Sequence, residues 1–468
     1  MTESYLVIGG EGFLGSTLVK ALLARYPNSS VSSLDLVQRH FPDQLSASSN
    51  KWTFYSADLT SLDDLSKAIR QSSATTVFHT ASPWTGSGAE VCEKVNVQGT
   101  RTIVDACVQE GVKKLVFTSS AGTVYNGVDL INVDERMPFP KEELDPYNVT
   151  KAKAERIVLE ANGRDGLLTV ALRPAGIFGP GDRQALPGVM AVLKSGKTKF
   201  QVGSNENLFD WTYVDNVVHA HLIASERLSK TVSPEALNSR ALPIDLDIKR
   251  RELPTSNFRP KTLLDKELKL DPSFKQDTEG DLPLLAGRNR FDQFYHLPAY
   301  AAEDASVGDK KDSIKTIKEE EEGAEEKASG TELEKTTTGG AEEKEYEDDL
   351  RVAGQAFFIT NGSPIPFWDF PRAVWAAYNR HEPSFVIPLP SEIGLLFAGI
   401  GEFVSGLMGK TPNLTRGKVV YSTVNRYYNI ERARRVLGYE PVVGLEEGIK
   451  RAVAWYKENE ASMEPKKA

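Results

Sequence analysis

One glycine-rich turn near the N-terminus carries most of the information about the fold: Gly9-Gly10-Glu11-Gly12-Phe13-Leu14-Gly15. An apolar run, residues 5–9, leads into it, and a helical pattern over residues 16–24 follows it. Glycines at a strand-to-helix turn let the backbone approach a pyrophosphate, whose charge is favoured by the amides at the helix N-terminus. We therefore expect this turn to bind a dinucleotide through Gly9, Gly12, Phe13, Leu14 and Gly15.

Further apolar runs recur along the chain, separated by stretches long enough for crossover helices. The candidates for buried strands are residues 5–9, 31–35, 52–56, 76–80, 114–119 and 168–173. This alternation over residues 5–230 is typical of an α/β protein with a doubly wound parallel sheet. The sequence thus predicts a Rossmann domain over residues 1–230 that also carries the catalytic residues.

The charge of the chain is unevenly distributed. Residues 301–350 hold 18 Asp or Glu and 7 Lys, a net of -11, whereas the whole chain of 468 residues carries -9. The remainder is therefore nearly neutral and predicts no basic face for nucleic acid. We expect residues 301–350 to be a disordered acidic segment, residues 231–300 to be an insert, and residues 351–468 to form a smaller substrate-binding region.

Cysteine usage and the N-terminus indicate the compartment. The two cysteines, Cys92 and Cys107, are too few for a disulfide framework and fit a reducing environment. No metal-ligand cluster is visible in the sequence. The N-terminus has no basic region followed by an apolar one, so we expect no secretory signal and a catalytic part that faces the cytosol.

The preferred cofactor follows from Asp35, twenty residues after Gly15 at the end of the second strand. An acidic residue there accepts hydrogen bonds from the adenosine ribose and repels a 2'-phosphate, which favours NAD over NADP. Arg39 is close enough in sequence to offset that preference. Four more residues after strands are candidates for the cofactor site, with an ordinary loop role as the alternative: Asp58, Leu59, Ala81 and Ser82.

Tyr147 and Lys151 stand four residues apart at the start of an amphipathic stretch, so they share one helix face. A free tyrosine has a pKa of about 10, and a nearby ammonium favours the phenolate that a general base requires. The lysine can also donate to the nicotinamide ribose. Because a Tyr-x-x-x-Lys match is common by chance, its weight depends on the surrounding motifs.

Three surrounding motifs support the pair. Phe117-Thr118-Ser119-Ser120-Ala121 ends a strand, where Ser120, or Ser119 as the alternative, can bind the reacting oxygen. Asn96 can hold a water that continues the proton path from Lys151, or it can be a hydrogen-bonding residue within a helix. Pro174 begins the loop after the sixth strand, where a segment lining the cofactor would lie.

With these motifs in order over residues 5–230, the chain resembles the extended short-chain dehydrogenases/reductases. Two runs are similar to the 3-beta-hydroxysteroid dehydrogenase branch: Leu208-Phe209-Asp210-Trp211-Thr212-Tyr213-Val214-Asp215-Asn216-Val217-Val218-His219-Ala220-His221 and Gly354-Gln355-Ala356-Phe357-Phe358-Ile359-Thr360-Asn361-Gly362-Ser363-Pro364-Ile365-Pro366-Phe367-Trp368. The long segment 231–350 departs from the compact pattern of the family and leaves the shape of a substrate lid open.

The resemblance implies oxidation of the 3-beta-hydroxyl of a 4-alpha-carboxysterol, with NAD as the cofactor. Tyr147 would remove the hydroxyl proton while Ser120 binds the oxygen, and the resulting beta-keto acid would lose its carboxylate as CO2. The implied partners are the sterol, the cytosolic face of the endoplasmic reticulum membrane, and other enzymes of sterol C4 demethylation.

Residues 385–408 hold an apolar stretch, residues 393–401, bounded by Glu392 and Glu402. A spanning helix needs about 20 apolar residues, so we expect no conventional transmembrane span here. An interfacial segment beside the sterol entrance and a helix buried against the substrate region are the two alternatives.

Two other functions compete with this interpretation. One is another extended-family oxidoreductase or epimerase, acting on a nucleotide sugar or a flavonoid ketone. The other is a catalytically silent NAD-binding scaffold, which would have no chemical need for Ser120, Tyr147 and Lys151.

Overall fold

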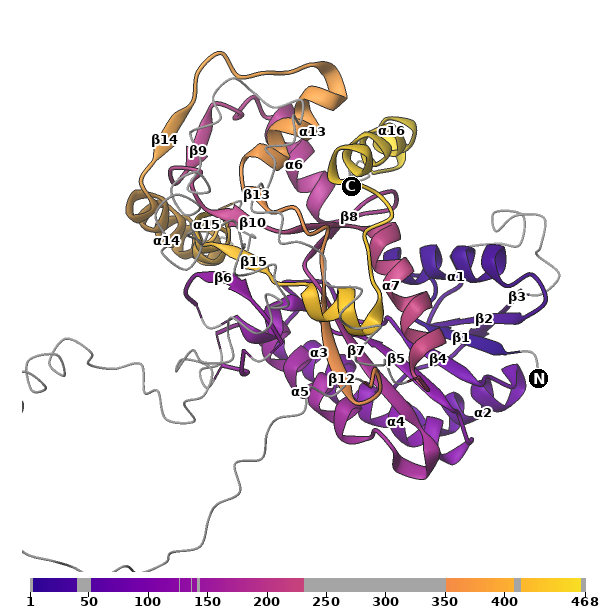
Figure 1. Cartoon of the computed structure of the whole chain (residues 1–468). Coiled ribbons are helices and arrows are strands. Elements are labelled where there is room, and N and C mark those ends of the chain that lie inside the picture. The colour runs from indigo at the N-terminus through magenta and orange to yellow at the C-terminus, as the bar shows by residue number, and fades with distance from the viewer. Residues whose placement is uncertain are drawn as a thin grey trace, which may run out of the picture. The chain divides into compact units, whose positions relative to one another are not determined.

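The computed structural model describes residues 3–39, 52–125, 127–135, 137–140, 144–230, 351–407 and 414–463 (Figure 1). These residues belong to one unit of the chain. The predictions for the insert at 231–300 and for the acidic segment at 301–350 lie outside the described residues.

A parallel sheet of seven strands, in the order β12-β7-β5-β4-β1-β2-β3, forms the centre of the fold. Every neighbouring pair in it is parallel. Its strands are β1 (Ser4–Ile8), β2 (Ser30–Asp35), β3 (Trp52–Ser56), β4 (Thr76–His79), β5 (Lys114–Thr118), β7 (Leu168–Pro174) and β12 (Gln355–Ile359). The predicted doubly wound parallel sheet is confirmed, and six of these strands start and end within a residue of the predicted runs.

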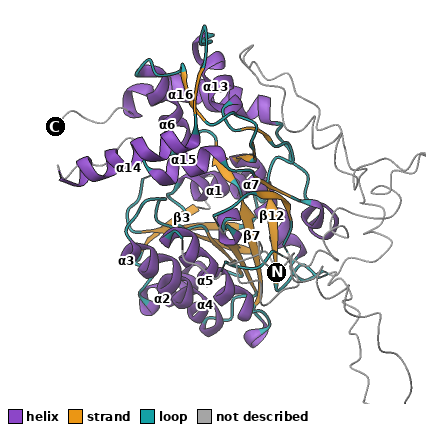
Figure 2. Cartoon of the chain, turned by 90° about the vertical axis from the view of Figure 1, so that its left-hand side faces the viewer, coloured by secondary structure: helices purple, strands orange, loops and turns teal. Residues whose placement is uncertain are grey.

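Helices cover both faces of this sheet (Figures 1 and 2). On one face lie α2 (Leu62–Ser72), α4 (Gly99–Gln109) and α5 (Pro146–Glu160), and on the other α1 (Phe13–Arg25) packs against α7 (Val214–Arg227). Short elements connect them: α3 (Ala89–Cys92), the π-helix η3 (Glu93–Gln98), and the 3-10 helices η4 (Ala121–Val124) and η5 (Arg164–Gly166).

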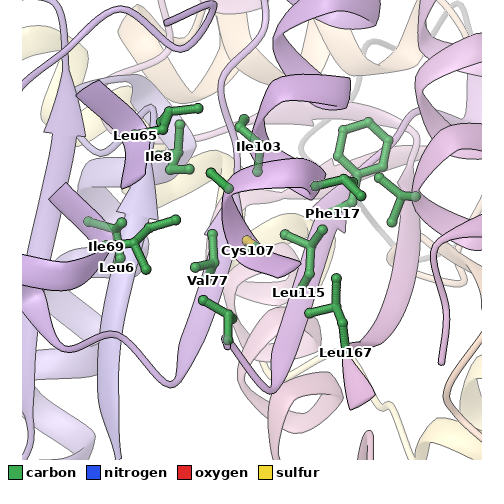
Figure 3. Close-up of a cluster of buried hydrophobic side chains, with 14 of the residues drawn as sticks. Leu6, Ile8, Leu65, Ile69, Val77, Ile103, Cys107, Leu115, Phe117 and Leu167 are labelled. Carbon is green, nitrogen blue, oxygen red and sulfur yellow. The ribbon is translucent and has the colours of Figure 1, made fainter. Parts of the chain in front are cut away.

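A large cluster of buried hydrophobic side chains lies between the sheet and the α2, α4 and α5 layer (Figure 3). Strand residues Leu6, Val77 and Leu115 are completely buried there, as are Leu65 of α2 and Ile103 of α4. Burying a leucine or isoleucine side chain contributes about 1.5–3 kcal/mol. This core therefore fixes the carboxyl ends of the strands, where the predicted site residues lie.

The prediction that the Rossmann domain ends at residue 230 needs one correction. β12, which follows the insert, pairs with β7 along its whole length, from Gln355 with Val170 to Ile359 with Pro174. A strand at the sheet edge can come from any part of the chain that reaches it. The C-terminal region thus contributes an edge strand to the cofactor-binding sheet.

The rest of the C-terminal region forms a second layer with residues 176–213 (Figure 1). A four-stranded sheet has the order β13-β10-β15-β6, and two pairs, β11 with β8 and β14 with β9, flank it. These strands are β6 (Leu130–Val133), β8 (Gly176–Phe178), β9 (Phe200–Val202), β10 (Leu208–Phe209), β11 (Trp211–Tyr213), β13 (Ile365–Pro366), β14 (Ile387–Leu389) and β15 (Arg426–Tyr428). The helices are α6 (Ala185–Lys194), α13 (Asp369–Asn379), α14 (Ser391–Leu407), α15 (Arg416–Thr423), the π-helix η7 (Ala433–Leu437) and α16 (Leu445–Met463).

The helix α14 contains the apolar stretch that the sequence singled out. One side of it packs on the protein, where Ala398 is completely buried in a cluster with Val202 and Val419. The other side exposes a row of large apolar side chains, Ile393, Leu396, Phe397, Ile400, Phe403 and Val404. Within the ranges that the structure describes, no helix is both long and apolar enough to cross a membrane.

Candidate active site

The glycine turn joins β1 to α1 in a conformation that only glycine accepts. Gly9 has a φ of +82°, and a Cβ on it would lie 2.6 Å from the backbone nitrogen of Ala81. A Cβ on Gly15 would lie 2.1 Å from the carbonyl oxygen of Gly9. The turn thus brings the first amides of α1, at Phe13 and Leu14, to the carboxyl edge of the sheet. The donor set fits the pyrophosphate of a dinucleotide.

Asp35 lies beside this turn at the end of β2. Its carboxylate accepts hydrogen bonds from the backbone nitrogens of Leu36 at 2.8 Å and Glu11 at 3.3 Å. Burial raises the pKa of Asp35 above its usual value, and these two amides oppose that rise. The predicted acidic residue is therefore adjacent to the glycine turn, as a ribose-binding carboxylate must be.

Glu11, which the sequence analysis assigned no role, ties the turn to β2. Its side chain is 3% exposed and accepts from Ser33 Oγ at 3.0 Å and from the backbone nitrogen of Arg39 at 2.8 Å. The segment after β2 is thereby held next to the glycine turn, with a second carboxylate near Asp35. The glutamate within the turn was visible in the sequence, but its hydrogen-bond partners were not.

The loops after β3 and β4 contain the four further cofactor candidates. The Asp58 carboxylate accepts from the nitrogen and hydroxyl of Thr60, so it stabilises its own turn. Leu59 fills the space beside Gly99 of α4, because a Cβ there would lie 1.7 Å from its Cδ1. Ala81 touches the glycine turn at Gly9, and the fourth candidate, Ser82, is next to it in the same loop. Pro174, a further cofactor candidate, is the last residue of β7.

The helix α5, which carries Tyr147 and Lys151, begins at a strong capping site. Asp145 is the N-cap and accepts from the backbone nitrogen of Asn148 at 3.0 Å, and Pro146 occupies the first helical position. This start places Tyr147 in the first turn and Lys151 one turn later on the same face. The predicted helix and its Tyr147–Lys151 spacing are both present in the structure.

Lys151 is almost completely enclosed, with 2% of its surface exposed. Its Nζ donates to the carbonyl oxygen of Thr118 at 2.5 Å and lies 4.2 Å from the centre of the Phe117 ring. Burial lowers the pKa of Lys151 to about 7, and the carboxylate of Glu155 opposes this fall. The lysine is thus poised between its charged and neutral forms near neutral pH.

Tyr147 shares a hydrogen-bond network with two of the candidates. Burial raises the pKa of Tyr147 above its usual value, and a hydrogen bond with the Ser82 hydroxyl opposes part of that rise. Ser82 Oγ in turn donates to Asn96 Oδ1 at 3.1 Å, and Asn96 Nδ2 donates to Thr150 Oγ1 at 3.0 Å. The structure therefore connects Ser82, Asn96 and the start of α5, with Asn96 held in the π-helix η3.

The two candidate serines after β5 have different surroundings. Ser119 is 3% exposed and its hydroxyl donates to Glu155 at 2.5 Å. Ser120 is the N-cap of η4, where its Oγ accepts from the backbone nitrogen of Gly122 at 3.1 Å and keeps its own proton for another acceptor. Of the two hydroxyls, the geometry favours Ser120 as the one that can donate to a substrate oxygen.

Next to Lys151 on α5 lies a buried ion pair that could not be predicted from the sequence. Glu155 lies one turn beyond Lys151 on α5 and is fully buried. Its carboxylate accepts hydrogen bonds from Nε and Nη2 of Arg173, the shortest of them 2.6 Å long. Arg173 comes from β7 and is 4% exposed. Tyr147, Lys151 and Glu155 thus form one column on α5, fixed to the sheet through Arg173.

A model of the 3-beta hydroxysteroid dehydrogenase/isomerase family matches residues 6–242. The decarboxylating sterol-4-alpha-carboxylate 3-dehydrogenase of Schizosaccharomyces pombe is 35% identical, over 97% of this chain and 97% of its own length. The Homo sapiens enzyme of the same name is 28% identical, over 96% of this chain and 87% of its own. The 3beta-hydroxysteroid-dehydrogenase/decarboxylase isoform 1 of Arabidopsis thaliana is 30% identical, over 99% and 82%.

Solved structures share the fold at lower identity. The dTDP-glucose 4,6-dehydratase DesIV of Streptomyces venezuelae, solved with NAD bound, is 18% identical with a TM-score of 0.57 and 99% of both chains covered. UDP-glucose 4-epimerase of Thermotoga maritima is 17% identical with a TM-score of 0.54, over 97% of this chain and 99% of its own. At these identities the likeness describes the fold alone.

Proposed function

The chain belongs to the 3-beta hydroxysteroid dehydrogenase/isomerase family, and we propose that it oxidises the 3-beta-hydroxyl of a 4-alpha-carboxysterol with NAD, releasing CO2 in sterol biosynthesis. One observation carries the proposal: similarity over nearly the full length of both chains to decarboxylating sterol dehydrogenases of fungi, plants and mammals. The ordered site at the carboxyl edge of the sheet supplies the residues that this chemistry needs.

The proposed roles follow from the residue types and from their places on α5 and at the end of β5. Tyr147 removes the proton of the 3-hydroxyl, Ser120 donates to the same oxygen, and the charge of Lys151 favours the phenolate. A bound nicotinamide supplies the chemistry of accepting the hydride from C3. Ser82 and Asn96, already hydrogen-bonded near Tyr147, continue the proton path away from the site.

Loss of CO2 requires no additional catalytic group. Oxidation at C3 gives a beta-keto acid, in which the new ketone accepts the electrons of the breaking C–C bond as an enolate. The protein then has to hold the carboxylated sterol and to protonate the enolate. The ketone oxygen stays at Ser120 and Tyr147, so the same two hydroxyls serve both stages.

NAD as the preferred cofactor is supported by two carboxylates at the adenosine end of the site. Asp35 ends β2 beside the glycine turn, and Glu11 holds the backbone of Arg39 next to it. A 2'-phosphate brought to this place would meet negative charge. The positive charge of the Arg39 side chain, which acts on Asp35, opposes this preference because it would attract a 2'-phosphate.

We also propose that the protein works at the cytosolic face of the endoplasmic reticulum membrane, in contact with other enzymes of sterol C4 demethylation. The exposed apolar row of α14 supports a membrane contact, because rows of this kind on a soluble surface mark interaction sites. A sterol substrate dissolves in the bilayer, so a protein that rests on it through α14 gains direct access.

The test is an assay of the pure protein with NAD and a 4-alpha-carboxysterol. We expect NADH to form together with the decarboxylated 3-ketosterol, measured by absorbance and by mass spectrometry. The variant Tyr147→Phe serves as the control for contaminating dehydrogenases. Turnover of a nucleotide sugar or a flavonoid ketone, with none of the carboxysterol, would contradict the proposal.

A further inference from the structure

Arg426 is a buried cation in the four-stranded sheet β13-β10-β15-β6. It lies at the start of β15, between β10, where it is opposite Phe209, and β6, where it is opposite Leu130. Its residue surface is 9% exposed. The guanidinium carbon lies 4.4 Å from the centre of the Tyr125 ring and 4.9 Å from that of Tyr421.

No carboxylate in the described part of the chain forms an ion pair with Arg426. Two acids on adjoining elements are used by other groups: Asp129 accepts from the backbone nitrogen and the side-chain Nδ2 of Asn425, and Asp210 accepts from the backbone nitrogen of Tyr428 at 2.8 Å. Buried arginines are almost always paired, because an uncompensated buried charge is costly. An anion from outside the described protein is therefore the expected partner.

The unused donors around Arg426 indicate what kind of anion fits. Aromatic rings stack on the guanidinium, while its N–H groups point outward in its own plane. One of these N–H groups forms a hydrogen bond with the Tyr428 hydroxyl. Among the described residues, Arg426 Nε and the hydroxyl of Tyr125 are buried without a hydrogen-bond partner. Two donors beside a planar cation suit a carboxylate, which can accept several hydrogen bonds at once.

This donor pair is linked to the catalytic serine by a single short helix. Ser120 is the N-cap of η4 and Tyr125 is its C-cap. A 3-10 helix rises about 2.0 Å per residue, so the two backbones are roughly 10 Å apart, a gap that the tyrosine and arginine side chains can narrow. Gly122 in η4 also packs directly on Asn148, the neighbour of Tyr147, since a Cβ there would lie 2.1 Å from Asn148 Oδ1.

We propose that Arg426 and Tyr125 form the subsite that receives the carboxylate of the substrate while its neighbouring hydroxyl is held at Tyr147 and Ser120. This inference rests on the proposed function and adds to it the residues that select a carboxylated sterol. A cation stabilises a bound carboxylate more than departing CO2, so Arg426 acts in recognition and orientation. It does not promote the loss of CO2.

The experiment compares two substrates in the variant Arg426→Met. One is the 4-alpha-carboxysterol and the other is a 3-beta-hydroxysterol with the same rings and no carboxylate. Removing one partner of a buried charge pair lowers kcat/KM on the order of 100-fold, so the carboxysterol should lose that factor and the plain hydroxysterol should keep its rate. NAD affinity, measured by fluorescence titration, should not change.

Two further variants complete the design. Arg426→Lys keeps the charge and should recover part of the lost rate with the carboxysterol alone. Arg416→Met removes an exposed cation of α15 that pairs with Glu402, and should leave both substrates unaffected. Equal effects of Arg426→Met on the two substrates, or no effect, would overturn the proposal.

The wild-type protein gives an independent measurement if Arg426→Met does not fold. The methyl ester of the carboxysterol removes the charge at the cost of one added methyl group, and we expect its kcat/KM for oxidation to fall on the order of 100-fold. An ester oxidised as fast as the acid would overturn the carboxylate subsite. Wild-type protein that oxidises neither form would instead refute the proposed function, so the two failures are distinguishable.

Discussion

The buried pair of Glu155 and Arg173 should contribute strongly to the stability of the candidate site, and Glu155→Gln tests this. The substitution keeps the size of the side chain but leaves Arg173, which is 4% exposed, without its anionic partner. Breaking a buried pair in this way costs about 3–5 kcal/mol. Urea unfolding at pH 7, followed by circular dichroism, measures the loss.

A matched exposed pair provides the control. Asp105 on α4 contacts Arg164 at 2.9 Å, and the two side chains are 43% and 52% exposed. Asp105→Asn should therefore lower the free energy of unfolding by less than about 1 kcal/mol. If Glu155→Gln loses no more stability than Asp105→Asn, the buried pair does not have the role argued for it.

The same substitution should change the pH dependence of catalysis. Lys151 has a pKa of about 7, which Glu155 raises against the effect of burial. Side chains at i and i+4 of a helix are about 6 Å apart. At that separation and an effective dielectric constant of ~20, the Glu155 carboxylate attracts the Lys151 ammonium by up to ~3 kcal/mol, and the positive charge of Arg173 offsets part of this attraction. Without Glu155 the lysine loses its proton at lower pH. We expect the alkaline limb of kcat/KM to move down by about 1 pH unit.

Three further predictions concern the cofactor, the lysine and the membrane. Asp35→Ser should reduce the preference for NAD in the ratio of the two kcat/KM values, and a wild-type protein equally efficient with NADP would exclude this role. Lys151→Met should raise the free energy of unfolding of the cofactor-free protein by about 2–4 kcal/mol at pH 6 and by less at pH 9. The sign follows because the folded pKa of about 7 lies below the unfolded value of 10.5, so the stability that Lys151 costs grows as the pH falls from 10.5 to 7 and is complete below 7; a gain that is equal at both pH values would disagree with it. Leu396→Asp with Phe403→Asp should reduce binding to liposomes without changing NAD affinity, and unchanged sedimentation with liposomes would rule out α14 as the contact.

The sequence was sufficient for the parts of the site that are local. The glycine turn, Asp35 and the pair Tyr147 and Lys151 each depend on a short spacing within one strand-turn-helix unit. Short spacings predict helix faces and strand ends directly. For the same reason the six strands of the parallel sheet that precede the insert could be placed to within a residue.

Contacts between distant segments could not be predicted. Glu155 meets Arg173 and Ser119 only because α5 packs on the sheet, and each of the three residues has an ordinary surface interpretation in sequence. Tyr125 and Arg426 are far apart in the sequence and meet only beside the folded sheet of β6, β10 and β15. The edge strand β12 was not assigned to the predicted Rossmann domain because it follows the long insert in the sequence.

The identity of the general base is the claim on which the account of the reaction depends. Tyr147→Phe removes a hydroxyl and its hydrogen bond with Ser82 while keeping the ring that packs in the site. Single-turnover oxidation of the carboxysterol at saturating NAD measures hydride transfer itself and is not obscured by slow product release. We predict a rate lower by about 100- to 10,000-fold, with NAD affinity unchanged. A variant that keeps most of the wild-type rate of hydride transfer would contradict the assignment of Tyr147.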